Sequence, residues 1–151
     1  TKLWPKEYYD ILIPMLKEKY TNIPVIQLGI SKDRCPRMDG VDIYLAGKTT
    51  FEQVKTLLSY STLHIDGEGG FVHLRHALSG GKSVVLFGPT SMDFYGYSEN
   101  INLRGNACPE CCEWITPNWQ EQCSAGFGKN LCMYSLSPNM VFNTISNNVE
   151  I

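Results

Sequence analysis

The sequence predicts an α/β fold in which helices flank a mostly parallel sheet. Short strands alternate with helices along the chain, which is typical of parallel α/β layers. Residues 83–87 are almost continuously apolar, as expected for a strand buried on both faces. Two expected strands run directly into glycine-containing turns, at residues 67–70 and 88–90. Because ligands of such sheets bind beyond the carboxyl ends of the strands, we expect a Rossmann-like ligand-binding domain.

The first half of the chain is expected to hold two helices and three strands. Apolar residues spaced three and four apart predict a helix over residues 6–20, which Pro14 should kink or split. Thr50 is a suitable N-cap for a second helix, over residues 51–59. The three short strands are expected at residues 25–28, 41–45 and 63–65.

A third helix is expected over residues 71–78, directly after the first glycine-containing turn. Its helical phase places His73 and His76 together on one side and a core stripe on another. The expected stripe consists of Phe71, Leu74 and Leu78. Two more strands follow, at residues 83–87 and 100–103, and a last helix begins at Ser137. Residues 105–135 carry no clear period, and we expect them to form a cysteine-rich insertion in a single domain that spans residues 1–151.

Composition limits the classes of function. A chain of 151 residues is close to the usual size of one domain, and its net charge of −2 argues against a surface that binds nucleic acid. The longest apolar runs are far shorter than the roughly 20 residues of a membrane-spanning helix. The sequence begins at Thr1 without a signal-like stretch, so we expect a piece of a longer protein.

The turn after the third strand carries the strongest local signal for a ligand. Glycines at positions 69 and 70 let a ligand approach the main chain, and the N–H groups of the following helical turn attract an anion. Glu68 is suited to accept hydrogen bonds from sugar hydroxyls, and His73 to contact a phosphate oxygen. The alternative is a tight strand–helix turn with surface histidines, because glycine-rich turns of this kind are common.

Cysteines form a second candidate site. Five of the six lie between positions 108 and 132, and Cys108 and Cys111 have the spacing that supplies two thiolates from one turn. We expect Cys123 and Cys132 to complete a tetrahedral sulfur site for a structural iron or zinc, with Cys112 as a substitute for Cys111. Such a site leaves no open position for catalysis. Buried thiols and disulfides remain the alternatives.

Four segments, in order, resemble motifs of glycosyltransferase family 9, which includes the lipopolysaccharide heptosyltransferases. They are Lys-Leu-Trp-Pro at residues 2–5, Leu-Ala-Gly-Lys-Thr-Thr-Phe at 45–51, Glu-Gly-Gly-Phe-Val-His-Leu at 68–74 and Val-Val-Leu-Phe-Gly-Pro-Thr at 84–90. The match covers most of the chain. The resemblance implies the C-terminal, donor-binding half of a GT-B glycosyltransferase.

The resemblance also implies a reaction and a set of roles. The implied reaction moves a heptose-like sugar from an ADP-sugar to a lipopolysaccharide or protein acceptor, without a catalytic cofactor. Lys2 and His73 would be the catalytic residues, with Lys2 offsetting the charge of the leaving diphosphate. The implied donor-binding residues are Thr49, Glu68, Gly69, Gly70, Gly88, Pro89 and Thr90.

Two features bear on these roles: a departure from the family pattern at Glu68 and Gly69, and the location of the family's general base. Many members of the family have Asp followed by Thr or Ser where this chain has Glu68 and Gly69. The form found here looks like the branch that modifies bacterial autotransporter proteins, which is associated with a cysteine-bound iron. The family's general base lies in an N-terminal acceptor domain, so we expect this chain to bind its donor weakly and to transfer nothing.

The resemblance implies a protein of the bacterial cytoplasm whose parent is able to associate peripherally with a membrane or to form oligomers. The expected partners are a nucleotide-diphosphate sugar and the N-terminal acceptor domain, with no nucleic acid and no membrane span. Two other functions stay open at this point. One is a non-catalytic nucleotide-binding domain, and the other is an interaction module whose functional surface is the cysteine–metal loop.

Overall fold

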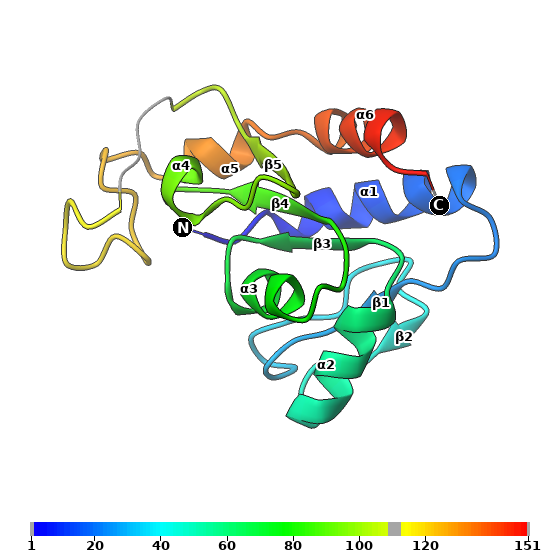
Figure 1. The fold of residues 1–151 in the computed structure, drawn as a ribbon. Helices are drawn as coiled ribbons and strands as arrows, with labels where there is room; N and C mark the ends of the chain where they lie inside the picture. Colours follow the sequence, from blue (N-terminus) through cyan, green and yellow to red (C-terminus); the bar gives the residue numbers. More distant parts are fainter. Residues whose placement is uncertain (1, 109–112, 151) are drawn as a thin grey trace.

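The computed structural model describes residues 2–108 and 113–150. Helices and strands alternate through most of this range, as the sequence predicts (Figure 1). In chain order the elements are α1 (Lys6–Lys19), β1 (Ile26–Gln27), β2 (Ile43–Tyr44), α2 (Phe51–Tyr60), β3 (His64–Gly67), α3 (Gly70–Ala77), β4 (Ser83–Phe87), α4 (Met92–Tyr95), β5 (Ile101–Arg104), α5 (Leu131–Tyr134) and α6 (Pro138–Asn148).

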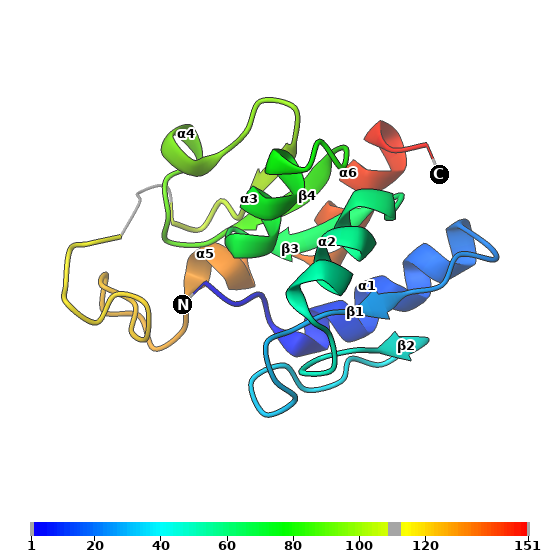
Figure 2. The same cartoon turned by 60° about the horizontal axis from the view of Figure 1, so that its bottom comes forward.

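All strand pairs are parallel, but they form two sheets. One sheet has the order β3-β4-β5 (Figure 1), and the other consists of β1 and β2 (Figure 2). β1 and β2 are shorter than expected, yet backbone hydrogen bonds continue beyond them. The N–H of Leu45 donates to the Gln27 carbonyl at 2.9 Å, and that of Gly47 to the Gly29 carbonyl at 3.0 Å. The predicted parallel sheet flanked by helices is confirmed, in two parts.

β4 is the centre of the core. Its five residues are buried, which confirms the prediction from its continuous apolar run. Val84 and Leu86 belong to a cluster with residues of α1, α5 and α6, whereas Val85 and Phe87 pack on Val72 of α3. Helices therefore cover both faces of the larger sheet (Figure 1).

The helices differ from expectation at two places. α1 continues through Pro14 as one helix, so of the two expected outcomes, a kink or a split, the split does not occur. Leu12 and Ile13 are buried and hold the helix on the core, while Pro14 is exposed, where water can bond the carbonyl that its ring leaves without a donor. In α3 the fully buried residues are Val72 and Arg75, instead of the stripe expected at Phe71, Leu74 and Leu78.

Arg75 is buried because backbone oxygens converge on its guanidinium. Its side chain is 1% exposed and donates to the carbonyls of Leu58, Ser61 and Gly81, and to the hydroxyl of Ser61. The charged group therefore joins the end of α2 to the turn before β4. Over residues 2–108 and 113–150, no helix has the length and apolar character needed to cross a bilayer.

Candidate functional site

The predicted ligand turn lies at the carboxyl end of β3, where α3 begins. Gly67 is in register with Leu86 of β4, and the N–H of Glu68 donates to the Leu86 carbonyl at 3.2 Å. Because β3 and β4 are parallel, the segment after β4 reaches the same edge of the sheet. The turn at residues 67–70 and Thr90 therefore meet there, as the sequence predicted.

The start of α3 is open to a ligand. In the described part of the chain, no side chain caps this helix at Gly69. A Cβ atom on Gly70 would meet nothing within 4 Å, and one on Gly69 would meet only the Gly67 carbonyl oxygen, at 3.8 Å. The φ angle of Gly69 is 173°, which is ordinary extended backbone. Glycine here therefore preserves space in front of the amide groups, where an anion would bind.

Three of the expected site residues form one charged cluster. The Lys2 ammonium lies 2.5 Å from Oε2 of Glu68, and Nε2 of His73 lies 3.3 Å from Oε1. The Glu68 side chain is only 5% exposed, whereas Lys2 and His73 keep about a third of their surface. Burial opposes ionisation of Glu68, but Lys2, with smaller contributions from the Thr90 hydroxyl and His73, brings its pKa below the ordinary value. The cluster thus joins an ionised carboxylate to an ammonium group and an imidazole, two groups suited to bind phosphate.

Tyr97 is a site residue that the sequence analysis missed. It lies in the loop between α4 and β5, and its hydroxyl is 2.9 Å from Nδ1 of His73. The His76 ring stacks on the Tyr97 ring, with 3.6 Å between ring centroids. The expectation that His73 and His76 share one side of α3 is therefore confirmed, and Tyr97 is what they face. No local sequence signal links a tyrosine 24 residues away to His73.

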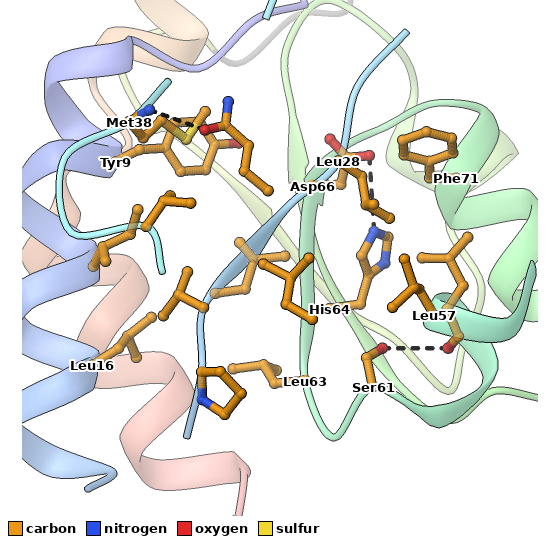
Figure 3. A pocket seen from close by; sticks show the side chains of 18 of the residues that line it. Tyr9, Leu16, Leu28, Met38, Leu57, Ser61, Leu63, His64, Asp66 and Phe71 are labelled. Carbon is orange, nitrogen blue, oxygen red and sulfur yellow. Dashed lines mark hydrogen bonds and ion pairs between the residues drawn. The ribbon is translucent and has the colours of Figure 1, made fainter. Parts of the chain in front are cut away.

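A cavity of about 650 Å³ opens beside the turn (Figure 3). Side chains from α1, β1 and α2 give it mostly apolar walls, and Asp66, Gly70 and Phe71 bring it to the start of α3. Burial raises the pKa of the Asp66 carboxyl to about 6, and it lowers that of the His64 imidazole to about 4. Both groups therefore resist charging inside a largely apolar space.

The other expected donor-binding residues are less directly placed. Thr49 is half-buried in the loop before α2, and within the described residues no hydrogen bond or ion pair joins it to the charged cluster. Gly88, Pro89 and Thr90 are buried, and Thr90 is only 2% exposed. They lie beneath the site rather than on its surface. The Pro89 carbonyl accepts a hydrogen bond from the N–H of Glu113, at 3.2 Å, which ties the cysteine-rich segment to this edge.

The cysteine site is partly described. Cys111, one of its four expected ligands, and Cys112, its substitute, lie outside the described residues. Burial raises the pKa of the Cys132 thiol, and the neighbouring thiols of Cys108 and Cys123 raise it further. These three cysteines are thus close enough to interact, but the described residues contain no group of three or more side chains placed to hold a metal ion.

Fold and site together define a Rossmann-like α/β domain in which α3 begins, without a side-chain cap from the described residues, at the end of a parallel strand. The sequence pattern of glycosyltransferase family 9 (heptosyltransferase) matches residues 1–126. The chain belongs to this family, which confirms the resemblance found in its motifs. No protein with a curated description matches the chain at a significant level.

Solved structures of two bacterial proteins share the fold. One is the ADP-heptose lipopolysaccharide heptosyltransferase II of E. coli, with a TM-score of 0.69 and 19% identity. The other is a glycosyl transferase of family 9 from Veillonella parvula, with a TM-score of 0.72 and 20% identity. In both comparisons 97% of this chain aligns with 41% of the solved chain. The chain thus spans about two fifths of the length of these relatives.

Proposed function

We propose that this chain is the donor-binding domain of a glycosyltransferase that takes a heptose-like sugar from an ADP-sugar. The observation that carries the proposal is the cluster of Lys2, Glu68 and His73 beside the uncapped start of α3. Helix amides, an ammonium group and an imidazole are the groups that bind a diphosphate. Membership of glycosyltransferase family 9 supplies the reaction class.

In this proposal the diphosphate lies over Gly69 and Gly70, in the open space before the first amides of α3, which we call the cradle. Added Cβ atoms on these glycines would occupy that space. When the donor binds, Lys2 and His73 exchange Glu68 for the phosphate oxygens. As the bond to the sugar breaks, negative charge grows on the departing diphosphate, and these two groups stabilise it. Because these donors are already held within 3.3 Å of one carboxylate, little reorganisation is needed at the moment of reaction.

The remaining parts of the donor have places beside the diphosphate. Glu68 accepts hydrogen bonds from sugar hydroxyls, and the nucleoside enters the mouth of the cavity near Gly70 and Phe71. Thr49 lines the region of the base, and Thr90, with Gly88 and Pro89, supports Glu68 from below. The match to an enzyme described as using ADP-heptose favours adenine as the base.

We infer that the acceptor site lies outside this chain, since the solved relatives are more than twice as long. A lipopolysaccharide or protein acceptor needs a general base to activate its hydroxyl, and that base would come from an N-terminal acceptor domain. The chain alone then binds donor and transfers no sugar, which a coupled assay of ADP release tests. Both solved relatives are bacterial, which supports the proposed bacterial cytoplasmic setting, where the parent meets a membrane only peripherally.

Calorimetric titration with pyrophosphate, ADP, GDP and UDP tests the proposal. ADP should bind, and Lys2→Ala and His73→Ala should each weaken it about tenfold or more, because each removes a charge-assisted contact. Lys55→Ala is a matched control, since Lys55 pairs with Glu52 at 2.8 Å on the exposed side of α2. If no nucleotide binds, or if all three variants bind ADP like the parent chain, the proposed function is wrong.

We also propose that Cys108, Cys111, Cys123 and Cys132 hold a structural iron or zinc. The spacing of Cys108 and Cys111, which supplies two thiolates from one turn, supports the proposal. Elemental analysis of the freshly purified chain should find about one metal ion per chain. Cys132→Ser should lose the metal, whereas Cys35→Ser, outside the cluster, should keep it. A chain without iron or zinc would refute the proposal.

A further inference from the structure

We propose that Tyr97 is a positioning residue that fixes the tautomer and ring orientation of His73. The proposal rests on the proposed function, in which His73 contacts the diphosphate. The Tyr97 hydroxyl lies 2.9 Å from Nδ1 of His73, and a Glu68 carboxylate oxygen lies 3.3 Å from Nε2. Both ring nitrogens therefore have partners, one on each side of the imidazole.

The chemistry of the two partners determines where the proton sits. An ionised carboxylate only accepts hydrogen bonds, and Lys2 keeps Glu68 ionised. Nε2 of His73 must therefore carry the hydrogen that points at Glu68. In a neutral imidazole this leaves a lone pair on Nδ1, which accepts the hydrogen of the Tyr97 hydroxyl. The order of donation then runs from Tyr97 to His73 to Glu68.

Tyr97 is held firmly enough to serve this purpose. Its ring packs against the buried cluster of Val72, Val85 and Phe87. Its carbonyl accepts hydrogen bonds from the Asn100 N–H at 3.1 Å and from the Asn102 side chain at 3.0 Å. Backbone and ring are thus both anchored, so the hydroxyl has a fixed place.

His76 also contacts the Tyr97 ring. The two rings stack with an interplanar angle of 12°, and His76 is itself paired with Glu99. The His73 ring instead meets the Tyr97 ring edge-on, at 80°. The tyrosine therefore lies between two histidines of α3, one stacked on its face and one hydrogen-bonded to its hydroxyl.

This arrangement has a consequence for ligand binding. The outer torsion of a histidine side chain is broad and allows the ring to turn over. The Tyr97 hydroxyl favours the orientation in which the N–H of Nε2 faces the cradle. When a diphosphate arrives, that N–H passes from Glu68 to a phosphate oxygen without turning of the ring or a change of tautomer.

Tyr97→Phe tests the inference, since it removes the hydroxyl and keeps the ring between the two histidines. Tyr95→Phe is the matched control, because Tyr95 lies two residues away and packs on the same buried cluster. Long-range ¹H–¹⁵N correlation spectra of the ligand-free chain report which nitrogen of His73 carries hydrogen. The parent chain and Tyr95→Phe should show hydrogen on Nε2, and Tyr97→Phe should show a mixture of tautomers. ADP binding should weaken about fivefold in Tyr97→Phe alone, as expected for one lost hydrogen bond.

Two results would overturn the inference. One is a parent spectrum with the hydrogen on Nδ1, which also decides the matter if Tyr97→Phe does not fold. The other is a folded Tyr97→Phe chain with an unchanged tautomer and unchanged ADP affinity. Because the tautomer is measured without ligand, it is independent of the proposed function. A chain that binds no ADP but shows the expected tautomers would refute the proposed function and leave the role of Tyr97 intact.

Discussion

Replacing Glu68 with Gln removes a negative charge from the centre of the proposed diphosphate cradle and keeps the size of the side chain. In the ligand-free chain this charge holds the Lys2 ammonium at 2.5 Å and the His73 ring at 3.3 Å. An incoming diphosphate must compete with Glu68 for both groups. The variant is therefore expected to bind pyrophosphate and ADP more tightly than the parent chain.

The size of the effect follows from the ion pair. At an effective dielectric constant of about 20, unit charges 2.5 Å apart attract by about 7 kcal/mol. Most of this attraction is offset by desolvation, since the Glu68 side chain is only 5% exposed. The Lys2 side chain is 31% exposed, so its ammonium can turn to water when the pair is broken. A net value of about 1 to 2 kcal/mol lies between those of exposed and buried pairs. It corresponds to about 5- to 30-fold tighter binding of ADP.

The sugar should respond in the opposite direction. If Glu68 accepts hydrogen bonds from sugar hydroxyls, its charged acceptor adds about 1.5 to 3 kcal/mol to binding of the whole donor, and the amide adds less. Since a neutral acceptor contributes about 0.5 to 1.5 kcal/mol, the ratio of ADP-sugar affinity to ADP affinity should fall about fivefold in the variant.

Calorimetry with pyrophosphate, ADP and an ADP-sugar measures both effects. Glu52→Gln is the matched control, because it removes the same charge from the Lys55 pair on α2 and should change neither affinity. Weaker ADP binding by a folded Glu68→Gln chain, with Glu52→Gln unchanged, would refute the competition argument. Glu68 would then support the phosphate site directly.

Three further predictions concern the fold and the cradle. Arg75→Met should lower the free energy of unfolding in urea by about 3 to 5 kcal/mol, because several buried oxygens lose their charged donor. Gly70→Ala should leave the urea midpoint unchanged, since the added Cβ meets no atom, but it should weaken ADP binding in calorimetry. His64, with its pKa lowered to about 4, contributes stability above pH 6.5 that is lost towards pH 4. Asp66, with its pKa raised to about 6, contributes stability below pH 3.8 that is lost as the pH rises through 6. Between pH 4 and 6.5 the urea midpoint should therefore rise with pH in Asp66→Asn and fall with pH in His64→Gln.

Elements with a strong local pattern were predictable from the sequence. β4 followed from its almost continuous apolar run, and the N-cap of α2 followed from Thr50. Burial of Arg75 was not predictable in this way, because the oxygens that bind it come from the end of α2 and from Gly81. A pattern that counts only apolar residues assigns such a guanidinium to the surface. The core stripe of α3 was wrong for this reason.

The candidate site was likewise predictable only where its residues are close together in the sequence. The glycines and His73 are close in sequence, so the turn and its helix were visible as a motif. Lys2 joined them only through the resemblance to a family, although the fold brings it within 2.5 Å of Glu68. Tyr97 had no signal at all, because its role depends on where a loop crosses the first turns of α3. Contacts between distant segments are what sequence periodicity cannot express.

In the proposed function, Glu68 keeps the phosphate-binding groups ordered while no diphosphate is bound. Lys2 and His73 would be mobile and hydrated if they faced an empty cradle, and ordering them would then oppose ligand binding. A buried carboxylate between them acts as an internal anion that fixes both groups while the site is open. A diphosphate carries more charge than one carboxylate and also reaches the α3 amides, so it can replace Glu68 as their partner. In the proposed function the carboxylate that pre-organises the site is then free to bind the sugar. Its loss should therefore tighten ADP binding and weaken the preference for the whole donor over ADP.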